Sequence, residues 1–397
     1  MKSQIIKIPI LLLYLLFIAF ALKFYHKIYF ISATLIILAS LSLSFIFINK
    51  ESIFNKNNIN IYIVFTIIIF LQLFSYFWTN SVDYSISKIL YFSLWAITFI
   101  IYTNLINENQ DKIIKINFFI GIFYIIFLFL EYGSPLQIIS SMDKFTRLGH
   151  SDDNTTNPIV IARYLGFFLM TSFFIFNEKN IIWKILILIL ILISFLFIFL
   201  TGSKGILLSL FLVSFIFIFK MKMKYIIYVL ILLIFFISIS ILFIDIDNML
   251  KDSKLYQFIE YRFLNSNHNS YSTRENQFSF ALDSFIKGNL FQQLFGYGIG
   301  NFGIAYFGID ERYYPHNIFL EILYENGLIS LFVFLYIILF MIKALIKLDL
   351  SNKYILYIVV CYYYFLFNAM VSGDIYENIP LFIFFILYND INKRKYF

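Results

Sequence analysis

Residues 181–200 have the sequence IIWKILILILILISFLFIFL, which carries a single charged side chain. A run of about 20 mostly apolar residues is long enough for one helix to cross the hydrocarbon core of a bilayer. Similar runs recur along the chain of 397 residues, which is 61% hydrophobic and only 13% charged. A soluble protein needs more charge to cover its surface. The composition therefore predicts an all-α polytopic membrane protein.

About twelve runs are long enough to span a membrane. They lie near residues 6–22, 28–48, 60–78, 86–105, 114–131, 157–176, 181–200, 205–220, 225–244, 317–342, 354–372 and 376–389. One long polar segment, residues 245–316, separates the ninth run from the tenth. We therefore divide the chain into residues 1–156, with the first five spans and an outer loop, and residues 157–397, with the remaining spans and the long loop.

The distribution of basic residues predicts the orientation, because lysine and arginine favour cytoplasmic joints. With the amino terminus in the cytoplasm, most basic residues fall in inner joints, and the outer joints 79–83 and 373–377 contain none. Lys2 and Lys7 before an apolar run are typical of a retained start-transfer segment. We expect both termini in the cytoplasm and the long loop outside. A net charge of +7 scattered in this way argues for membrane lipids, and against nucleic acid, as partners.

The long loop contains a predicted helix. Ser272 and Glu275 have the spacing of a capping box, and the helix is expected to end near Gly288. Four apolar residues follow on one helical face: Phe278, Ala281, Leu282 and Phe285. Arg274 would then lie in the first turn, beside free backbone N–H groups, where a phosphate or pyrophosphate can bind. The alternative is a solvated arginine on a surface helix.

Glycine is concentrated near the end of this loop, at Gly296, Gly298, Gly300 and Gly303. No strand precedes these glycines and no βαβ unit surrounds them, so they do not form a dinucleotide-binding fingerprint. We expect tight turns that let the backbone approach another segment closely.

His316 lies between Pro315 and Asn317 at the start of the tenth span, and Asn317 is a suitable N-cap. A helix N-terminus disfavours the imidazolium, so we expect a neutral ring that can accept a proton. A structural histidine, hydrogen-bonded to the loop backbone, is an equal alternative. Glu321 and Glu325 follow within the span, where carboxylates need partners.

Three further cations lie near the outer ends of spans: Arg147, Arg163 and Lys204. Each can extend to lipid headgroups, or several can converge on one outer cavity. Asp245 and Asp247 match the D-x-D pattern of metal-dependent sugar transferases, but they also fit ordinary boundary residues of a span. Cys361 is the only cysteine, which excludes an intramolecular disulfide and a zinc site built from cysteines.

These motifs together resemble the O-antigen ligase/polymerase superfamily. The residues that carry the resemblance are, in order, Thr201-Gly202-Ser203-Lys204-Gly205, Arg274 with Ala281-Leu282, Gly296-Tyr297-Gly298, His316-Asn317-Ile318-Phe319-Leu320-Glu321 and Glu325-Asn326-Gly327. The resemblance is sharpest over residues 195–335. The plan of spans, with the large loop after the ninth, is similar too, and Arg147-Leu148-Gly149 is similar to the family's loop before the sixth span.

The resemblance implies a bacterial inner-membrane glycosyltransferase that works outside the cytoplasm without a metal or other cofactor. Its donor would be an oligosaccharide on undecaprenyl pyrophosphate, and its acceptor another glycan or the lipid A core. The family's functional positions correspond to His316, Arg274 and Lys204. We regard four residues as weaker substrate-binding candidates: Arg147, Arg163, Asn317 and Glu321. Lys204 replaces the usual arginine, which keeps the charge but loses a planar two-pronged contact.

Three activities share this architecture. A polymerase joins repeat units of O antigen or capsule, a ligase transfers finished glycan to the lipid A core, and a third type transfers it to protein. The sequence of residues 316–328 favours a polymerase slightly, with the ligase as the close alternative. A polysaccharide flippase is an alternative of another class, but transporters place charge near the midplane and have two related halves, and this sequence shows no such halves.

Overall fold

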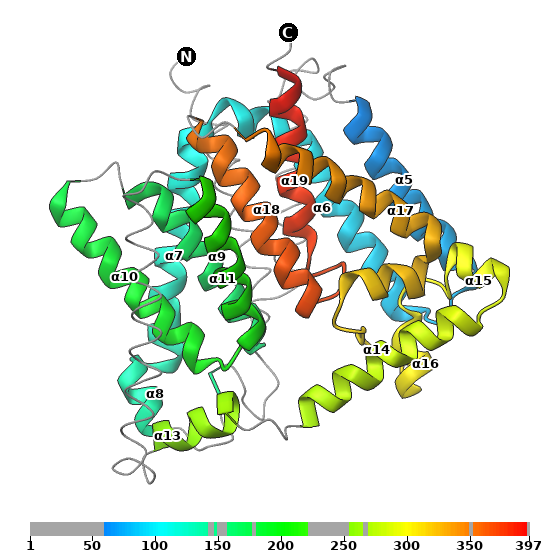
Figure 1. Ribbon diagram of the computed structural model, residues 1–397, viewed down its shortest axis with the longest axis horizontal. Helices are drawn as coiled ribbons and strands as arrows, with labels where there is room; N and C mark the ends of the chain where they lie inside the picture. Colours follow the sequence, from blue (N-terminus) through cyan, green and yellow to red (C-terminus); the bar gives the residue numbers. More distant parts are fainter. Residues whose placement is uncertain are drawn as a thin grey trace. The chain divides into compact units, whose positions relative to one another are not determined.

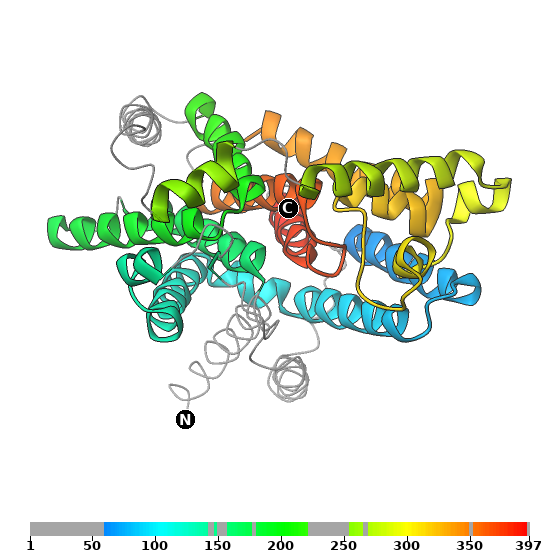
Figure 2. The same ribbon diagram turned by 90° about the horizontal axis from the view of Figure 1, so that it is seen from below.

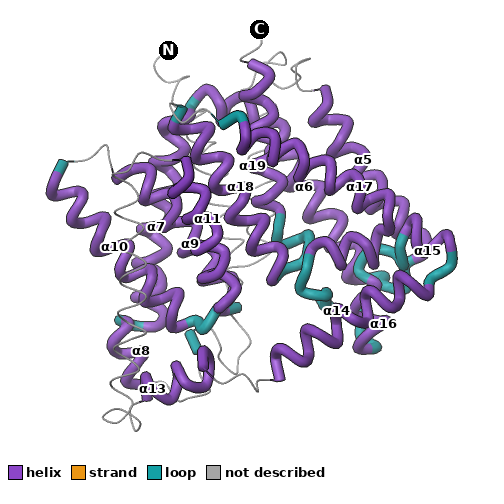
Figure 3. Tube along the Cα trace, in the orientation of Figure 1, coloured by secondary structure: helices purple, strands orange, loops and turns teal. Residues whose placement is uncertain are grey.

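The computed structural model describes residues 59–141, 147–148, 157–176, 180–220, 254–264, 269–348 and 352–394. In these residues the regular secondary structure is entirely helical (Figures 1 and 3). Six of the described helices are long and apolar enough to cross a membrane. The all-α fold is therefore confirmed, while the count of twelve spans and the position of the long loop stay predictions. The predicted spans 6–22, 28–48 and 225–244 lie outside the described residues, and every other predicted span coincides with a described helix.

The chain forms two compact units. Unit 1 comprises, of the described residues, 59–110 and 269–394. Its helices are α5 (Ile59–Ser75), the 3₁₀ turn η2 (Tyr76–Trp78), α6 (Asp83–Glu108), α14 (Asn269–Lys287), α15 (Leu290–Phe295), α16 (Asn301–Phe307), α17 (Ile318–Ile346), α18 (Lys353–Val371) and α19 (Ile379–Arg394). Helix α19 packs against α6 and α18, and α17 packs against α5, α14 and α15. The core of this unit lies around α18 and α19, whose described side chains are nearly all buried.

Unit 2 comprises the described residues from 111 to 264. Its helices are α7 (Gln110–Tyr132), α8 (Pro135–Ser141), α9 (Pro158–Phe176), α10 (Ile181–Leu200), α11 (Lys204–Lys220), α13 (Lys254–Ile259) and the π-helical turn η3 (Glu260–Leu264). Helix α9 packs against α10 and α11, while α8 packs against α10 and α13. The side chain of Lys254 donates a hydrogen bond to the Ser140 carbonyl at 3.0 Å, which joins α13 to α8.

Helix α17 is broken at Gly327, which has a φ of 73°. The break leaves carbonyl groups without their usual helical donors. The glycine-rich loop supplies two replacement donors. The Tyr297 N–H donates to the Tyr324 carbonyl and the Gly298 N–H donates to the Glu325 carbonyl, each at 2.9 Å. Irregular backbone inside a membrane protein is tolerated where other protein segments satisfy its hydrogen bonds. The glycine-rich loop therefore completes the broken helix.

The glycines of this loop allow close contact between backbones, as the sequence predicted. A Cβ atom on Gly296 would lie 2.3 Å from the Glu325 carbonyl, and one on Gly298 would lie 2.6 Å from Thr79. The Thr79 hydroxyl also donates to the Ile299 carbonyl at 2.8 Å. The joint after α5 is thus hydrogen-bonded to the loop, and the prediction of tight turns for close approach is confirmed.

The prediction for α14 was wrong at its start and right at its end. The helix begins at Asn269 rather than after Ser272, and it ends at Lys287, directly before Gly288. Arg274 therefore lies in the second turn, away from the free N–H groups that were expected to bind a phosphate. The buried face also differs, because Gln277 and Ala281 are buried while Leu282 is 41% exposed.

Candidate active site

His316 lies in the short loop between α16 and α17. Its φ of 53° is in the left-handed region, which is uncommon for a residue with a side chain and clusters at functional sites. The imidazole is partly buried, with its centroid 4.6 Å from the Tyr314 ring. Its Nδ1 atom is buried and makes no hydrogen bond with the part of the chain that the structure describes.

Burial, together with the positive charge of Arg274, lowers the pKa of His316 to about 4. The ring is therefore neutral at physiological pH and able to accept a proton. The predicted neutral ring is confirmed, although its causes are desolvation and a neighbouring guanidinium rather than the helix terminus.

Arg274 and Asn317 approach the same end of α18. The Arg274 guanidinium donates to the Val371 carbonyl at 3.4 Å, and the Asn317 amide donates to the Met370 carbonyl at 3.1 Å. The Asn317 side chain also accepts hydrogen bonds from the first turn of α17, as expected of an N-cap. Two of the three predicted catalytic residues, Arg274 and His316, therefore belong to unit 1, and Arg274 and the residue after His316 contact the same end of α18.

A second cation, Arg312, lies four residues before His316 and was not singled out from the sequence. Its guanidinium binds both oxygens of Asp374 at 3.2 and 3.3 Å, and lies 2.5 Å from Glu377. The Tyr84 hydroxyl donates to Asp374 as well. The guanidinium holds the pKa of Asp374 below its usual range, although burial acts in the opposite direction. The acidic, base-free joint 373–377 was the sequence signal for such a pairing.

The carboxylates that the sequence placed inside the tenth span share one buried lysine. The ammonium of Lys88 on α6 lies 2.5 Å from Glu321 and 2.7 Å from Glu325, and all three side chains are almost completely inaccessible. Glu321 also accepts the Ile375 N–H at 2.9 Å. Glu321 was a candidate for substrate binding. Its buried oxygens instead join α6, α17 and the joint after α18.

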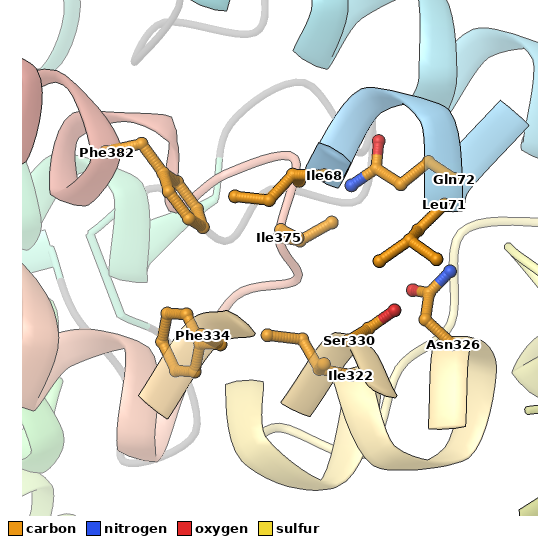
Figure 4. Close-up of a pocket in the computed structure, with 9 residues that line it drawn as sticks. All are labelled: Ile68, Leu71, Gln72, Ile322, Asn326, Ser330, Phe334, Ile375 and Phe382. Carbon is orange, nitrogen blue, oxygen red and sulfur yellow. The ribbon is translucent and has the colours of Figure 1, made fainter. Parts of the chain in front are cut away.

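A cavity lies next to this ion network in unit 1. Figure 4 shows its lining residues: Ile68, Leu71, Gln72, Ile322, Asn326, Ser330, Phe334, Ile375 and Phe382. The aromatic rings lie at one end, and the amides of Gln72 and Asn326 lie toward the other. Ile375, whose N–H binds Glu321, forms part of the wall. The cavity is therefore mostly apolar and shares Ile375 with the ion network.

Lys204 lies in unit 2, at the first residue of α11. The turn before it, Thr201–Ser203, is contacted by two segments that are distant in the sequence. The Leu148 N–H donates to the Leu200 carbonyl at 3.0 Å, which brings Arg147 to this turn. Arg262, on the π-helical turn η3, packs against Gly202 of this turn. A Cβ atom added to Gly202 would lie 3.4 Å from the Arg262 Cδ atom.

Stacked aromatic rings position η3 on this turn. Phe199, at the end of α10, stacks on Phe263 with centroids 4.9 Å apart and planes 1° apart. Three basic residues, Arg147, Lys204 and Arg262, therefore come from three segments to one turn of unit 2. Nothing in the sequence pattern pointed to Arg262.

The remaining candidates lie elsewhere. Arg163 is fully buried within α9, so it does not extend to the lipid headgroups. Asp245 and Asp247 lie outside the described residues. Within the described ranges, no group of three or more His, Cys, Asp or Glu side chains is arranged to hold a metal ion.

Comparison with known families gives one finding. A family model described as O-antigen ligase matches residues 188–335. This segment contains Lys204, Arg274 and His316. It also contains the first part of α17, including the break at Gly327. No curated protein matches the chain.

Proposed function

We propose that this chain, a member of the O-antigen ligase/polymerase superfamily, is a metal-independent glycosyltransferase that polymerises glycan repeat units carried on undecaprenyl pyrophosphate. The reaction would take place on the extracytoplasmic side of the bacterial inner membrane. The observation that supports this proposal most strongly concerns His316 and Arg274, which both lie in the segment that the family match covers: the imidazole is partly buried and neutral, and the Arg274 guanidinium contributes to its lowered pKa and contacts the end of α18.

The reaction requires one proton transfer and one displacement. A hydroxyl oxygen of the acceptor sugar attacks the anomeric carbon of the donor and forms the new glycosidic bond. The bond from that carbon to the lipid pyrophosphate breaks, and its electron pair leaves with the pyrophosphate oxygen. His316 accepts the hydroxyl proton, which a neutral ring with a pKa of about 4 can do at physiological pH.

The departing pyrophosphate gains negative charge, and cations stabilise such a leaving group in a site from which water is excluded. Arg274 is the residue of unit 1 that we assign to this role. Lys204 belongs to unit 2, and its assignment rests on the resemblance to the family. Arg147 and Arg262 approach the turn that carries Lys204, which supports an anion-binding role for that turn.

Arg312 does not fit this role, although it is also near His316. Asp374 and Glu377 neutralise its charge by direct contact. We assign it to holding the Arg312–His316 loop against the joint after α18.

A ligase is the second candidate, because the matching family model is described as O-antigen ligase. The two activities differ in the acceptor. We propose to incubate the purified full-length protein with undecaprenyl-pyrophosphate-linked repeat units and EDTA. Lipid-linked chains of increasing length support the polymerase, whereas transfer that occurs only when lipid A core is added supports the ligase. If no glycosidic bond forms with either acceptor, the result contradicts a glycosyltransferase and favours a flippase.

A further inference from the structure

The short helix α15 packs against α17 and lies near the end of α5 that leads into η2 (Figures 1 and 2). Trp78 contacts Phe291 edge-to-face with centroids 5.0 Å apart, and Phe74 contacts Phe295 at 6.3 Å. The Trp78 indole also donates to the Gly296 carbonyl at 3.1 Å. These contacts fix the position of α15 relative to an apolar helix of unit 1.

Four large apolar side chains around this contact remain exposed. We call them the outer apolar patch: Phe77 at 82%, Ile286 at 66%, Leu290 at 73% and Phe291 at 46% exposure. A group of large exposed apolar side chains marks a surface that is covered by a membrane or by another protein.

The patch continues the lipid-facing side of α5. Along this helix, exposed apolar residues recur at helical spacing: Ile59, Ile63, Ile67, Phe70, Leu73 and Phe74. Phe77 extends this stripe to the outer end of the helix, and Leu290 and Phe291 follow through the Trp78 contact. Aromatic side chains at the end of a membrane helix are typical of the boundary between acyl chains and headgroups.

A charged edge accompanies the apolar one. Asp283 and Lys287 on α14 form an exposed ion pair at 3.4 Å, next to Ile286 on the same helix. An apolar edge beside a charged edge is typical of helices that lie in the plane of a membrane interface. We propose that the outer apolar patch is inserted in the phospholipid headgroup boundary, so that α14 and α15 lie on the membrane rather than in bulk water.

This placement is independent of the reaction, but it has a consequence for it. Arg274 is on the same helix as the charged edge. It would therefore work near headgroup depth, where the pyrophosphate of a lipid carrier is located.

The test is the depth of spin labels in the full-length protein, reconstituted in phosphatidylglycerol-containing nanodiscs. The single native cysteine, Cys361, is fully buried and is replaced by alanine. Labels are placed at Leu290→Cys in the patch, at Phe70→Cys in the α5 stripe and at Asp283→Cys. Asp283 is the matched control, since its side chain is 63% exposed on the charged edge. If Cys361→Ala does not fold, the wild-type background serves, because the buried thiol is inaccessible to the label.

We expect the ratio of oxygen to nickel-chelate collision rates at position 290 to be severalfold higher than at 283 and lower than at 70. A ratio at 290 equal to that at 283 would place the patch in water and overturn the proposal. Shielding of the 290 label from both reagents would show that protein covers the patch. Spin–spin broadening at 290 would identify a second copy as the occupant. Either of these outcomes also overturns it.

Discussion

The ammonium of Lys88 lies 2.5 Å from the carboxylate of Glu321, and this contact joins α6 to the first half of α17 inside unit 1. Glu325 shares the same ammonium, so one positive charge faces two carboxylates in a region without solvent. Burying charges is costly unless each is paired and hydrogen-bonded. The Ile375 N–H supplies a further hydrogen bond to Glu321. The start of α17, which carries the His316 loop, therefore depends on this group of ions.

Replacing Lys88 with methionine should destabilise the protein by about 3–5 kcal/mol, because two buried carboxylates lose their cation. The apparent melting temperature of the detergent-solubilised protein, followed by size-exclusion chromatography, measures this loss. The triple variant Lys88→Met/Glu321→Gln/Glu325→Gln removes all three charges and should recover most of the stability. Lys287→Met, in an exposed ion pair, is the control and should change little. A Lys88→Met protein as stable as this control would contradict a structural role for the buried ions.

Substitution of Gly296 by alanine should prevent stable folding. The residue has a φ of 80°, and the added Cβ would lie 2.3 Å from the Glu325 backbone. We expect a cost above about 4 kcal/mol, in the exceptional range for one substitution. Gly308→Ala is the matched control, because Gly308 has a φ of 75° and nothing lies within 4 Å of an added Cβ. Its cost should be about 1–2 kcal/mol from backbone strain alone. Equal melting temperatures for the two variants would show that the loop does not pack closely on α17.

The acid limb of the pH–rate profile should lie near pH 4. His316 has a pKa of about 4 in the folded protein, below the ordinary value of 6.5, so the ring stays neutral and able to accept a proton down to that range. Arg274→Gln removes a positive charge, so the limb should move to higher pH, although burial still depresses the pKa. The shift is measured in addition to any loss of rate. A wild-type limb at pH 6.5 that does not move in Arg274→Gln would contradict the environment described for the ring.

The lowered pKa of His316 also determines how the folding stability changes with pH. Between about pH 4 and 6.5 the unfolded chain binds a proton at His316 that the folded chain does not. The neutral ring therefore contributes to stability above pH 6.5, and this contribution is lost as the pH falls toward 4. His316→Asn should flatten that part of the stability profile.

Arg262 provides a test of the basic turn in unit 2. If the turn binds pyrophosphate, Arg262→Gln and Lys204→Gln should each reduce kcat on the order of 100-fold, the effect of removing one donor to a developing charge. Lys254→Gln is the control, since Lys254 lies on the adjacent helix α13 and binds the Ser140 carbonyl. Normal turnover in both Arg262→Gln and Lys204→Gln, measured with the lipid-linked donor, would remove this turn from the site.

Long apolar runs made the described spans predictable, because membrane-spanning helices need little more than length and hydrophobicity. The glycine spacing predicted that this loop approaches another segment closely, but not that the segment is α17. The break of α17 at Gly327 depends on tertiary hydrogen bonds, which the sequence pattern does not show. Ser272 and Glu275 have the spacing of a capping box, yet they lie inside α14, because the helix continues upstream to Asn269. Local spacing alone does not exclude such an extension.

The ion pairs were the least predictable feature. Lys88 is the one charge within its apolar run from 84 to 107, which indicates a buried partner without naming it. Asp374 and Glu377 stand in a joint without basic residues, and their partner Arg312 is more than 60 positions away in the chain. Arg262 has no distinguishing neighbour in the sequence. Its position follows only from the stacking of Phe263 on Phe199.

The role of His316 as the base is tested most directly by glycan transfer with purified His316→Asn protein and an undecaprenyl-pyrophosphate-linked donor. Asparagine tolerates the left-handed backbone that His316 adopts at φ 53°, so the substitution removes the imidazole without adding backbone strain. We predict a loss of about 10²–10⁴-fold in the rate of bond formation, with normal expression and an unchanged elution profile. Glycan chains formed by this variant at the wild-type rate would contradict proton transfer to His316.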